Sequence, residues 1–302
     1  MLAKKIYRDL NAVFLLDKAD GASSNQVLQK VRHCFEAKKA GHTGALDPIA
    51  TGMLPICFGE ATKFSQFLLD SDKEYEVTAL LGQRTTTSDR EGEVVETRDV
   101  QVTNEQIFTA IESFLGEQQQ TPSVYSALKY QGKPLYWYAR QGIDVPRPTR
   151  TITFYEIEVQ AIELPKLKLR VRCSKGTYIR TLVDDLGEVL GCGAHVTELR
   201  RTQVANYPYA KMMSFEALET IAEQGLDAID GLLLPVDSAL QDLPTLELTE
   251  EQAARLKQGQ RFYAPEGTEP SLYRAYQSEQ FVGLVEVNEK GLIQPKRLVK
   301  TN

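Results

Sequence analysis

The sequence predicts an α+β fold built on a mixed, largely antiparallel sheet. Predicted strands outnumber predicted helices along the 302 residues, adjacent strands look hairpin-linked, and the helices are interspersed among them. Hydrophobic residues make up 42% of the chain and charged residues 25%, as is ordinary for a globular protein. The length allows one large domain or two ordinary ones with a substantial core.

Capping patterns and apolar periodicity locate the elements. Ser23 and Gln26 have the spacing of a capping box, apolar residues then repeat on one helical face, and Gly41 is expected to end this first helix. Further helices are predicted over 60–69, 103–115, 135–142 and 177–190. Strands are predicted over 13–16, 53–58, 75–81, 94–97, 152–159, 167–173 and 196–204, and a strand followed by a turn over 126–132. Residues 118–122 are expected to break regular structure.

The last third of the chain indicates a second unit. Residues 213–240 are acidic and helical, and we expect them to flank the first domain. The pattern then starts afresh, with a capped helix from Thr249 and short strands near 261–264, 272–276, 281–287 and 292–299. We therefore divide the chain into residues 1–240 and a small β-rich, barrel-like module over residues 241–302.

The strongest candidate for a catalytic side chain lies on a glycine-flanked loop. Residues 41–48 read Gly-His-Thr-Gly-Ala-Leu-Asp-Pro, and the two glycines favour a tight loop over a helix. Pro48 restricts the backbone of Asp47 and so directs its carboxylate. A carboxylate displayed this way suits a nucleophile or a general base. The alternative is a turn in which Asp47 caps its own backbone.

This loop and several later segments resemble the bacterial tRNA pseudouridine-55 synthases, the TruB family. The loop resembles the family's signature as far as Lys63, and Asp17-Lys18 with Gly21 resembles its N-terminal element, although Ala19 stands where proline is usual. Further matching segments follow in the expected order over roughly the first 205 residues: 73–75, 126–129, 132–134, 176–182 and 195–202. An ordered set of motifs is far more specific than one glycine loop.

The resemblance implies the pseudouridine-synthase fold and the isomerisation of uridine 55 in the T loop of tRNA. It assigns the nucleophile to Asp47, attacking either C6 of the base or C1′ of the ribose. It implies that Arg180 pairs with Asp47, keeping it ionised, and a nearby arginine ordinarily lowers an aspartate pKa by ~1–3 units. Tyr75 is expected to stack on the uracil, with its hydroxyl available for proton transfer. Taken alone, a tyrosine on a strand is more often part of a core.

The resemblance also implies a base-binding site reached by base flipping. Tyr178 and Leu199 match positions that line the uracil pocket, and His42 is expected to fill the space that the flipped base leaves or to hold the loop. By its position in the family, the C-terminal module is expected to be a PUA-like RNA-binding domain. Candidate contacts to the RNA backbone are the following basic residues: Lys129, Lys133, Arg140, Arg147 and Arg150.

The net charge of −6 does not favour nucleic acid at first sight, but charge is segregated along the chain. Residues 212–254 hold ten acidic residues and no basic one, and residues 166–180 hold six basic residues and no acidic one. A basic face is therefore compatible with an acidic protein. On the strand 167–173, Lys166, Lys168, Arg170 and Arg172 share a face that is either a solvated sheet surface or an RNA contact.

Nothing in the sequence indicates a metal or a cofactor. The four cysteines are widely spaced, without a Cys-x-x-Cys pair, so neither a zinc site nor a disulfide framework is expected. The first residues lack a signal-peptide core, and no apolar run approaches the ~18 residues that span a bilayer. We expect a cytoplasmic protein that acts on tRNA as a monomer, with no obligate protein partner and no membrane association.

Three other functions compete with this interpretation. A protein that binds or folds RNA without modifying it would share most of these features, and both roles can coexist in one protein. A metal-free hydrolase using Asp47 would need a paired carboxylate or a Ser-His-Asp set, and no such motif is present. A pseudouridine synthase that works on guided RNA targets is the nearest competitor, but the motifs are closer to the stand-alone bacterial type.

Overall fold

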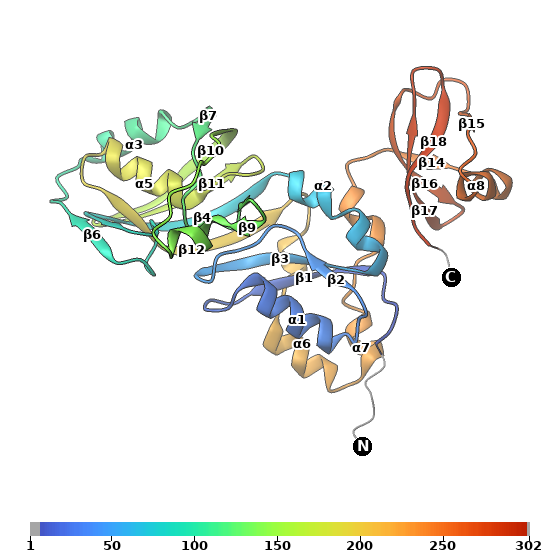
Figure 1. Cartoon of the computed structure of the whole chain (residues 1–302), viewed down its shortest axis with the longest axis horizontal. Coiled ribbons are helices and arrows are strands. Elements are labelled where there is room, and N and C mark those ends of the chain that lie inside the picture. The colour runs from blue at the N-terminus through green and yellow to red at the C-terminus, as the bar shows by residue number, and fades with distance from the viewer. Residues whose placement is uncertain (1–6, 301–302) are drawn as a thin grey trace.

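The computed structural model describes residues 7–300 and contains two units, each built around its own sheet (Figure 1). The N-terminal residues 1–6, where no signal-peptide core is expected, and residues 301–302 lie outside this part. The larger unit holds most of the chain, and the smaller C-terminal unit stands at one end of the molecule. Within residues 7–300, every helix is too short or too polar to cross a membrane.

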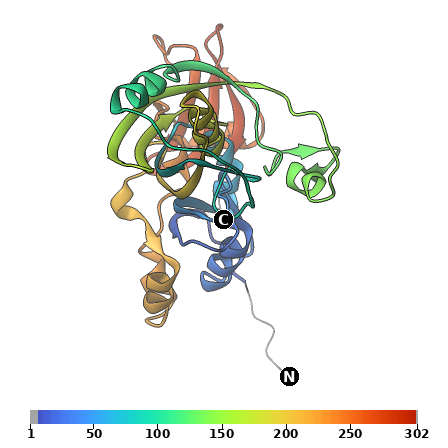
Figure 2. The same ribbon diagram turned by 90° about the vertical axis from the view of Figure 1, so that its left-hand side faces the viewer.

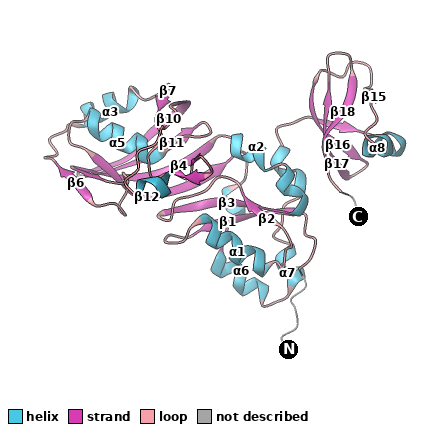
Figure 3. Cartoon of the chain, viewed as in Figure 1, coloured by secondary structure: helices cyan, strands magenta, loops and turns pink. Residues whose placement is uncertain are grey.

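The sheet of the larger unit has nine strands, eight of which follow the order β13-β1-β3-β12-β4-β11-β10-β7, while β2 pairs with β3. They are β1 (Ala12–Lys18), β2 (Ala40–His42), β3 (Ala50–Phe58), β4 (Lys73–Leu81), β7 (Gly116–Gln120), β10 (Arg150–Glu163), β11 (Lys166–Cys173), β12 (Ala194–Val204) and β13 (Met213–Ser214). Only the pairs β1–β13 and β3–β12 are parallel. The predicted mixed, largely antiparallel sheet is therefore confirmed (Figure 3).

Alternation along the strands gives this sheet two apolar surfaces. On β1, Phe14 and Leu16 belong to the main core, whereas Val13 and Leu15 belong to a second cluster on the other face. The main core is covered by α1 (Ser24–Cys34), α3 (Asn104–Glu112), α5 (Ile179–Val189), α6 (Phe215–Ala222) and α7 (Leu226–Asp230). The predicted cap at Ser23 is present: the backbone N–H of Gln26 donates to the Ser23 hydroxyl, and the backbone N–H of Ser23 donates to the side-chain oxygen Oε1 of Gln26.

Several predicted boundaries are wrong, mostly where short polar strands form. The first helix ends at Cys34 rather than near Gly41, because β2 takes up residues 40–42 and pairs with β3. The helix predicted over 60–69 is two pieces, the 3-10 helix η1 (Gly59–Lys63) and α2 (Ser65–Asp70). The stretch expected to break structure, 118–122, falls largely in strand β7. Its glutamines pair through the backbone with β10, which a side-chain pattern does not reveal.

Residues 121–149 form a segment that projects from the body of the larger unit (Figure 2). It contains the hairpin of β8 (Lys129–Tyr130) and β9 (Lys133–Pro134), followed by the short helix α4 (Leu135–Ala139). A second hairpin, β5 (Gln83–Thr85) with β6 (Val94–Thr97), follows β4. The polar stretch 83–92 therefore begins with β5.

The basic residues of β11 lie on the open face of the sheet. In register, Val171 stands opposite Tyr75 and Arg170 opposite Glu76, so the basic side chains point away from the face that carries Tyr75. Arg170 forms ion pairs with carboxylates of the neighbouring strands: Glu74 at 3.1 Å, Glu156 at 2.9 Å and Glu158 at 2.7 Å. Since carboxylates neutralise this charge, the structure favours a solvated sheet face over an RNA contact here.

Gly52 allows β3 and β12 to run side by side. Its φ is +97°, and a Cβ at this position would lie 2.2 Å from the backbone oxygen of Arg201. Gly52 and Arg201 are also partners in the parallel register. Only glycine fits this contact, which brings the strand after the Asp47 loop against β12.

The C-terminal unit is a five-stranded sheet in the order β14-β16-β17-β18-β15. Its elements are β14 (Thr245–Glu247), α8 (Glu250–Lys257), β15 (Phe262–Tyr263), β16 (Ser271–Gln277), β17 (Gln280–Val287) and β18 (Leu292–Leu298). The predicted helix and four strands are present, and β14 is additional. The 3-10 helix η3 (Val236–Leu240) lies between the two units along the chain, whereas the 3-10 helix η2 (Tyr209–Lys211) connects β12 to β13 within the larger unit.

The C-terminal unit is packed against the larger one rather than tethered loosely. The rings of Phe64 and Phe281 meet edge-on at 5.6 Å between centroids, and Lys63 donates to the carbonyl of Leu298 at 2.9 Å. Arg274 pairs with Asp237 of η3 at 3.5 Å, and both side chains are largely buried. The contacts therefore fix the C-terminal unit to η1 and the start of α2, directly after β3, and to η3.

Candidate active site

The Asp47 loop, residues 43–49, connects β2 to β3 and is held by the first elements of the chain. The hydroxyl of Ser24, at the start of α1, accepts from the Leu46 amide at 2.7 Å and donates to the Leu46 carbonyl at 2.9 Å. The amide of Gly21 donates to the Pro48 carbonyl at 2.9 Å. These contacts fix the loop on both sides of Asp47.

Lys18, the last residue of β1, is the strongest anchor of this loop. Its ammonium group is buried and donates to the carbonyls of Ala19, Pro48 and Ala50 at 2.9, 3.0 and 2.7 Å. Burial lowers the pKa of Lys18 to about 8, although the charges of Asp20 and Asp47 oppose this fall. The contact with residue 19 uses its carbonyl oxygen, which proline would also supply, so alanine here leaves this anchor intact.

Asp47 and Arg180 form the centre of the site. Arg180 Nε lies 2.9 Å from Asp47 Oδ2, as expected from the sequence. The arginine side chain is 4% exposed, whereas the aspartate side chain is 40% exposed and so remains open to a substrate. The remaining guanidinium nitrogens donate to the carbonyls of Thr87 and Tyr125, both at 2.9 Å. Arg180 therefore has a fixed position, from which it orients the carboxylate.

Asp89 is a site residue that the sequence analysis missed. Its carboxylate is buried, and its Oδ2 lies 3.1 Å from Arg180 Nη1. Its other oxygen accepts from the hydroxyl of Thr87 at 2.6 Å and the amide of Glu91 at 3.0 Å. Asp89 lies in a polar stretch, three residues before Gly92, and this local pattern does not predict that the loop meets α5. Arg180 is thus shared between two aspartates.

The pKa of Asp47 moves in the direction opposite to the one expected from its pairing with Arg180. Desolvation by the surrounding protein raises this pKa above its ordinary value, and the charge of Asp89 adds to the rise. Arg180 and Lys18 oppose it without reversing it. The expected net lowering is therefore wrong, because the desolvation of the carboxylate, together with the charge of Asp89, outweighs the charges of Arg180 and Lys18.

Two tyrosines predicted for the site lie around this carboxylate. The charge of Asp47 acts on the phenols of both Tyr75, on β4, and Tyr178, at the N-cap of α5, and burial raises the pKa of each phenol. The side-chain amide of Gln120 holds the backbone of Tyr178, accepting from its amide at 2.8 Å and donating to its carbonyl at 3.1 Å. Gln120, on β7, is a second positioning contact that the sequence analysis missed.

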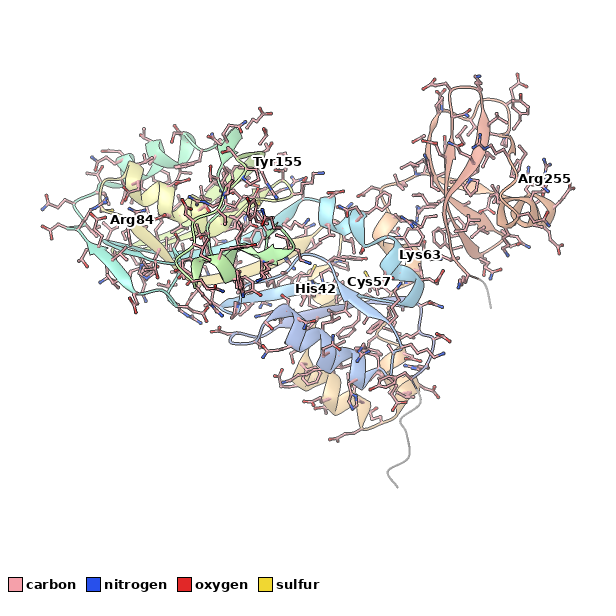
Figure 4. The ribbon with its side chains drawn as sticks, in the orientation of Figure 1. His42, Cys57, Lys63, Arg84, Tyr155 and Arg255 are labelled. Atoms are coloured by element: carbon pink, nitrogen blue, oxygen red, sulfur yellow. The ribbon has the colours of Figure 1, made fainter. Side chains whose placement is uncertain are left out.

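Leu199 and His42 complete the predicted set. Leu199 on β12 is buried and stands opposite both Val77 of β4 and Ala50 of β3. His42 ends β2, and Figure 4 shows it near the centre of the molecule, with Lys63 on the side of the C-terminal unit and Arg84 toward the opposite end. Its Nδ1 is buried without a hydrogen-bond partner among residues 7–300. Desolvation and then the charge of Arg201 lower the His42 pKa, which favours a neutral ring.

The five predicted RNA-contacting residues are divided between the projecting segment and its base. Lys129, Lys133, Arg140 and Arg147 are exposed on or beside this segment. Lys133 Nζ lies 3.4 Å from the centroid of the Trp137 ring, and Arg140 lies over Tyr136. Arg150 begins β10 and is close enough to Tyr178 for its charge to act on that phenol. Of the five, only Arg150 is linked to the Asp47 site.

The arrangement can perform nucleophilic or acid–base chemistry on a bound ring. It offers one accessible carboxylate, a fixed guanidinium and two phenols. In the part of the chain that the structure describes, no group of three or more histidine, cysteine or acidic side chains could hold a metal ion.

Comparison with known families accounts for almost the whole chain. Residues 32–179 match the family described as "TruB family pseudouridylate synthase (N terminal domain)". Residues 180–241 match "tRNA pseudouridylate synthase B C-terminal domain", and residues 244–299 match "Pseudouridine synthase II TruB, C-terminal".

Individual relatives are similar over their full length. Proteins named tRNA pseudouridine synthase B from Vibrio campbellii and Pasteurella multocida are each 56% identical, over 99% of this chain and 98% of the relative. The protein of the same name from Actinobacillus pleuropneumoniae is 57% identical over 98% of each chain.

Two solved structures share the fold. A chain in "Structure of H/ACA RNP bound to a substrate RNA containing 2'-deoxyuridine" superposes with a TM-score of 0.73 at 23% identity, covering 96% of this chain and 85% of that one. A chain in "Crystal Structure of a Cbf5-Nop10-Gar1 Complex" gives a TM-score of 0.71 at 26% identity, covering 96% and 84%.

Proposed function

The chain belongs to the TruB family of pseudouridylate synthases, and from this premise we propose that it converts uridine 55 in the T loop of tRNA to pseudouridine, with Asp47 as the nucleophile. The observation that carries the proposal is the ion pair between Arg180, which is buried, and Asp47, which is still 40% exposed. A carboxylate held in one orientation and open to a substrate is what covalent catalysis requires.

The reaction is an isomerisation within one nucleotide. The N1–C1′ bond of uridine breaks, the uracil rotates, and a C5–C1′ bond forms; a base then removes the proton from C5, and N1 gains a proton, so the product is an isomer of the substrate. Asp47 attacks C6 of the uracil or C1′ of the ribose and leaves again when the new bond is made. Asp47 must be ionised for this attack, and Arg180 stabilises the ionised form against the desolvation that raises the Asp47 pKa.

The other residues of the site have roles in holding the base. Tyr75 stacks on the uracil and its hydroxyl takes part in proton transfer, while Tyr178 and Leu199 line the base. His42, with a neutral ring, occupies the space that the uridine leaves when it flips out of the loop. Flipping is required because C6 and C1′ are inaccessible in a stacked loop.

The RNA is held by surfaces beyond the catalytic loop. We assign backbone contacts to the exposed basic residues of the projecting segment and to Arg150 at its base: Lys129, Lys133, Arg140, Arg147 and Arg150. Residues 241–302 form a PUA-like unit that contributes to RNA binding, and the boundary at residue 240 follows η3. The protein acts in the cytoplasm as a monomer, without a cofactor or an obligate partner.

Pseudouridine mapping on an unmodified tRNA transcript tests the proposal. The wild-type protein, without any cofactor, is compared with Asp47→Asn and with the matched control Asp227→Asn, which removes an exposed carboxylate from α7. We expect conversion at the T-loop uridine by the wild type and the control only. Conversion by Asp47→Asn would remove Asp47 from its role, and tight tRNA binding without any conversion would favour a protein that only binds or folds tRNA.

A further inference from the structure

Two adjacent arginines on β12 have opposite environments. Arg200 points to the open face, where it pairs with Asp17 at 2.7 Å and stacks on Tyr209. Arg201 points to the face that carries the active site and is 2% exposed, which makes it one of the largest fully buried side chains of the protein. Both lie in the segment 195–202 singled out in the sequence, but the proposed function gives neither a role.

Among the residues that the structure describes, the buried charge of Arg201 has no carboxylate partner. None of the acidic side chains in residues 7–300 lies within 4.0 Å of its guanidinium, whereas Arg180 has Asp47 and Asp89. Burying a charge without a counter-ion costs much free energy, and a neutral side chain of similar volume would avoid that cost. The fold therefore keeps a cation beside the active site at the expense of stability.

Arg201 is anchored on β3 and from there reaches two parts of the active site. Its Nε donates to the Met53 carbonyl at 2.7 Å, which fixes the guanidinium against β3. Its Nη2 donates to the carbonyl of Gly44 at 3.0 Å, within the turn that connects His42 to Asp47. The third neighbour is Tyr75, which stands opposite Arg201 in the strand register. The guanidinium is close enough for its charge and hydrogen bonding to lower the pKa of this phenol, against the rise that burial causes.

We propose that Arg201 is a positioning residue for this reaction, which acts through the hydroxyl group of Tyr75 and aligns it with the Asp47 loop. This inference rests on the proposed function. One rigid guanidinium fork contacts both the loop backbone and the phenol, so the distance between Asp47 and the Tyr75 hydroxyl is set by a single side chain. Its positive charge also stabilises negative charge that develops on the phenol oxygen when that group releases a proton.

The experiment measures single-turnover conversion, tRNA affinity and thermal stability for Arg201→Met, with Arg200→Met as the matched control on the same strand. Removing Arg201 is expected to lower the single-turnover rate about 10- to 100-fold, because a hydrogen bond from a charged donor is lost at the reacting group. The tRNA affinity is expected to change by less than about threefold, because no contact to the RNA backbone is removed. Arg200→Met is expected to react at nearly the wild-type rate.

A second measurement separates positioning from simple loss of structure. With tyrosines labelled at the ring carbon that bears oxygen, the resonance of Tyr75 is assigned by its loss in Tyr75→Phe and followed by NMR as pH is raised. Arg201→Met is expected to move this titration to higher pH, since Arg201 lowers the pKa of the phenol. If Arg201→Met does not fold, Arg201→Lys is measured instead. Lysine keeps the positive charge but lacks the forked guanidinium group, so we expect the single-turnover rate and the Tyr75 titration to change in the same direction as in Arg201→Met.

The outcomes are distinct. A slower rate together with a shifted Tyr75 titration supports the proposal. An unchanged rate, or a rate that falls while the Tyr75 titration stays in place, overturns it and leaves Arg201 as a structural residue. A wild-type protein that converts no uridine would overturn the proposed function instead, and this inference with it.

Discussion

Replacing Lys18 with methionine tests how the Asp47 loop is held. The ammonium group of Lys18 is buried and donates to three carbonyls, two of which belong to Pro48 and Ala50, beside the nucleophile. Methionine fills a similar volume but donates nothing, so Lys18→Met leaves these carbonyls without their donor. We expect the variant to fold with a displaced loop.

The magnitude follows from the contacts and from the cost of burial. Hydrogen bonds from a charged donor contribute about 1.5–3 kcal/mol each. Burying the charge opposes this gain: the fall of the Lys18 pKa from 10.5 to about 8 corresponds to a free-energy cost of about 3 kcal/mol. We therefore expect the free energy of unfolding to fall by about 2–5 kcal/mol. The single-turnover rate should fall by about 100-fold or more, because a shift of about 1 Å in a reacting group has this effect.

The assay combines urea denaturation with single-turnover conversion, and Lys73 provides the matched control. Lys73 is also buried, donates to the carbonyls of Leu68, Leu69 and Ser71, and has its pKa lowered to about 8. Lys73→Met should lose a similar amount of stability but a smaller share of the rate, since these carbonyls lie outside the Asp47 loop. Equal losses of rate in the two variants would refute the reasoning.

The same lysine makes a prediction about pH. An unfolded lysine keeps its proton up to about pH 10.5, whereas folded Lys18 releases it near pH 8. In that window the unfolded chain binds more protons at this residue, so the contribution of Lys18 to stability rises with pH. Lys18→Met should flatten that part of the stability profile; an unchanged slope would contradict the lowered pKa.

Three further predictions concern the site, the sheet and the RNA surface. Asp89→Asn removes a charge that raises the Asp47 pKa, so the acid limb of the pH–rate profile should move to lower pH, while the rate at neutral pH falls about tenfold as Arg180 loses a partner; an unmoved limb would contradict the shared guanidinium. Gly52→Ala should cost about 3 kcal/mol or more in urea denaturation, because its Cβ would meet Arg201, against about 1 kcal/mol for Gly116→Ala, which has a similar φ and open space. Neutralising Lys129, Lys133, Arg140 and Arg147 together should weaken tRNA binding and flatten its salt dependence, and binding unchanged across salt would remove them from the interface.

The elements with local signals could be predicted from the sequence. The capping boxes at Ser23, Thr103 and Thr249 all form, because each depends only on residues three positions apart. The alternation on β11 likewise gives its two faces correctly. By contrast, β2, β7 and β14 were not predicted, since strands of three to five residues that pair through their backbones leave little pattern in the side chains.

In the active site, too, the features encoded by neighbouring residues could be predicted, whereas the contacts between distant segments could not. The Asp47 loop was found from its own residues, and its pairing with Arg180 was expected from the family resemblance. The partners Lys18, Asp89 and Arg201 could not be found as such, because each becomes a neighbour only through strand register or loop packing between segments far apart in the chain. The expected direction of the Asp47 pKa is wrong for the same reason, since this pKa depends first on burial by segments distant in the chain and also on the charge of Asp89.

The supports of the Asp47 loop also set the order in which the protein can be completed during synthesis. Lys18 and Ser24 precede the loop, but Arg180 and Arg201 follow it by well over one hundred residues, and the contact between Gly44 and Arg201 spans 157 positions. The ribosome has therefore released the nucleophile long before the side chains that orient it exist. The catalytic loop can reach its final geometry only after β12 has been made and has paired with β3. The central strands of the sheet therefore pair late in synthesis. Contacts of such long sequence separation slow folding, and they make the active site one of the last parts of the larger unit to form.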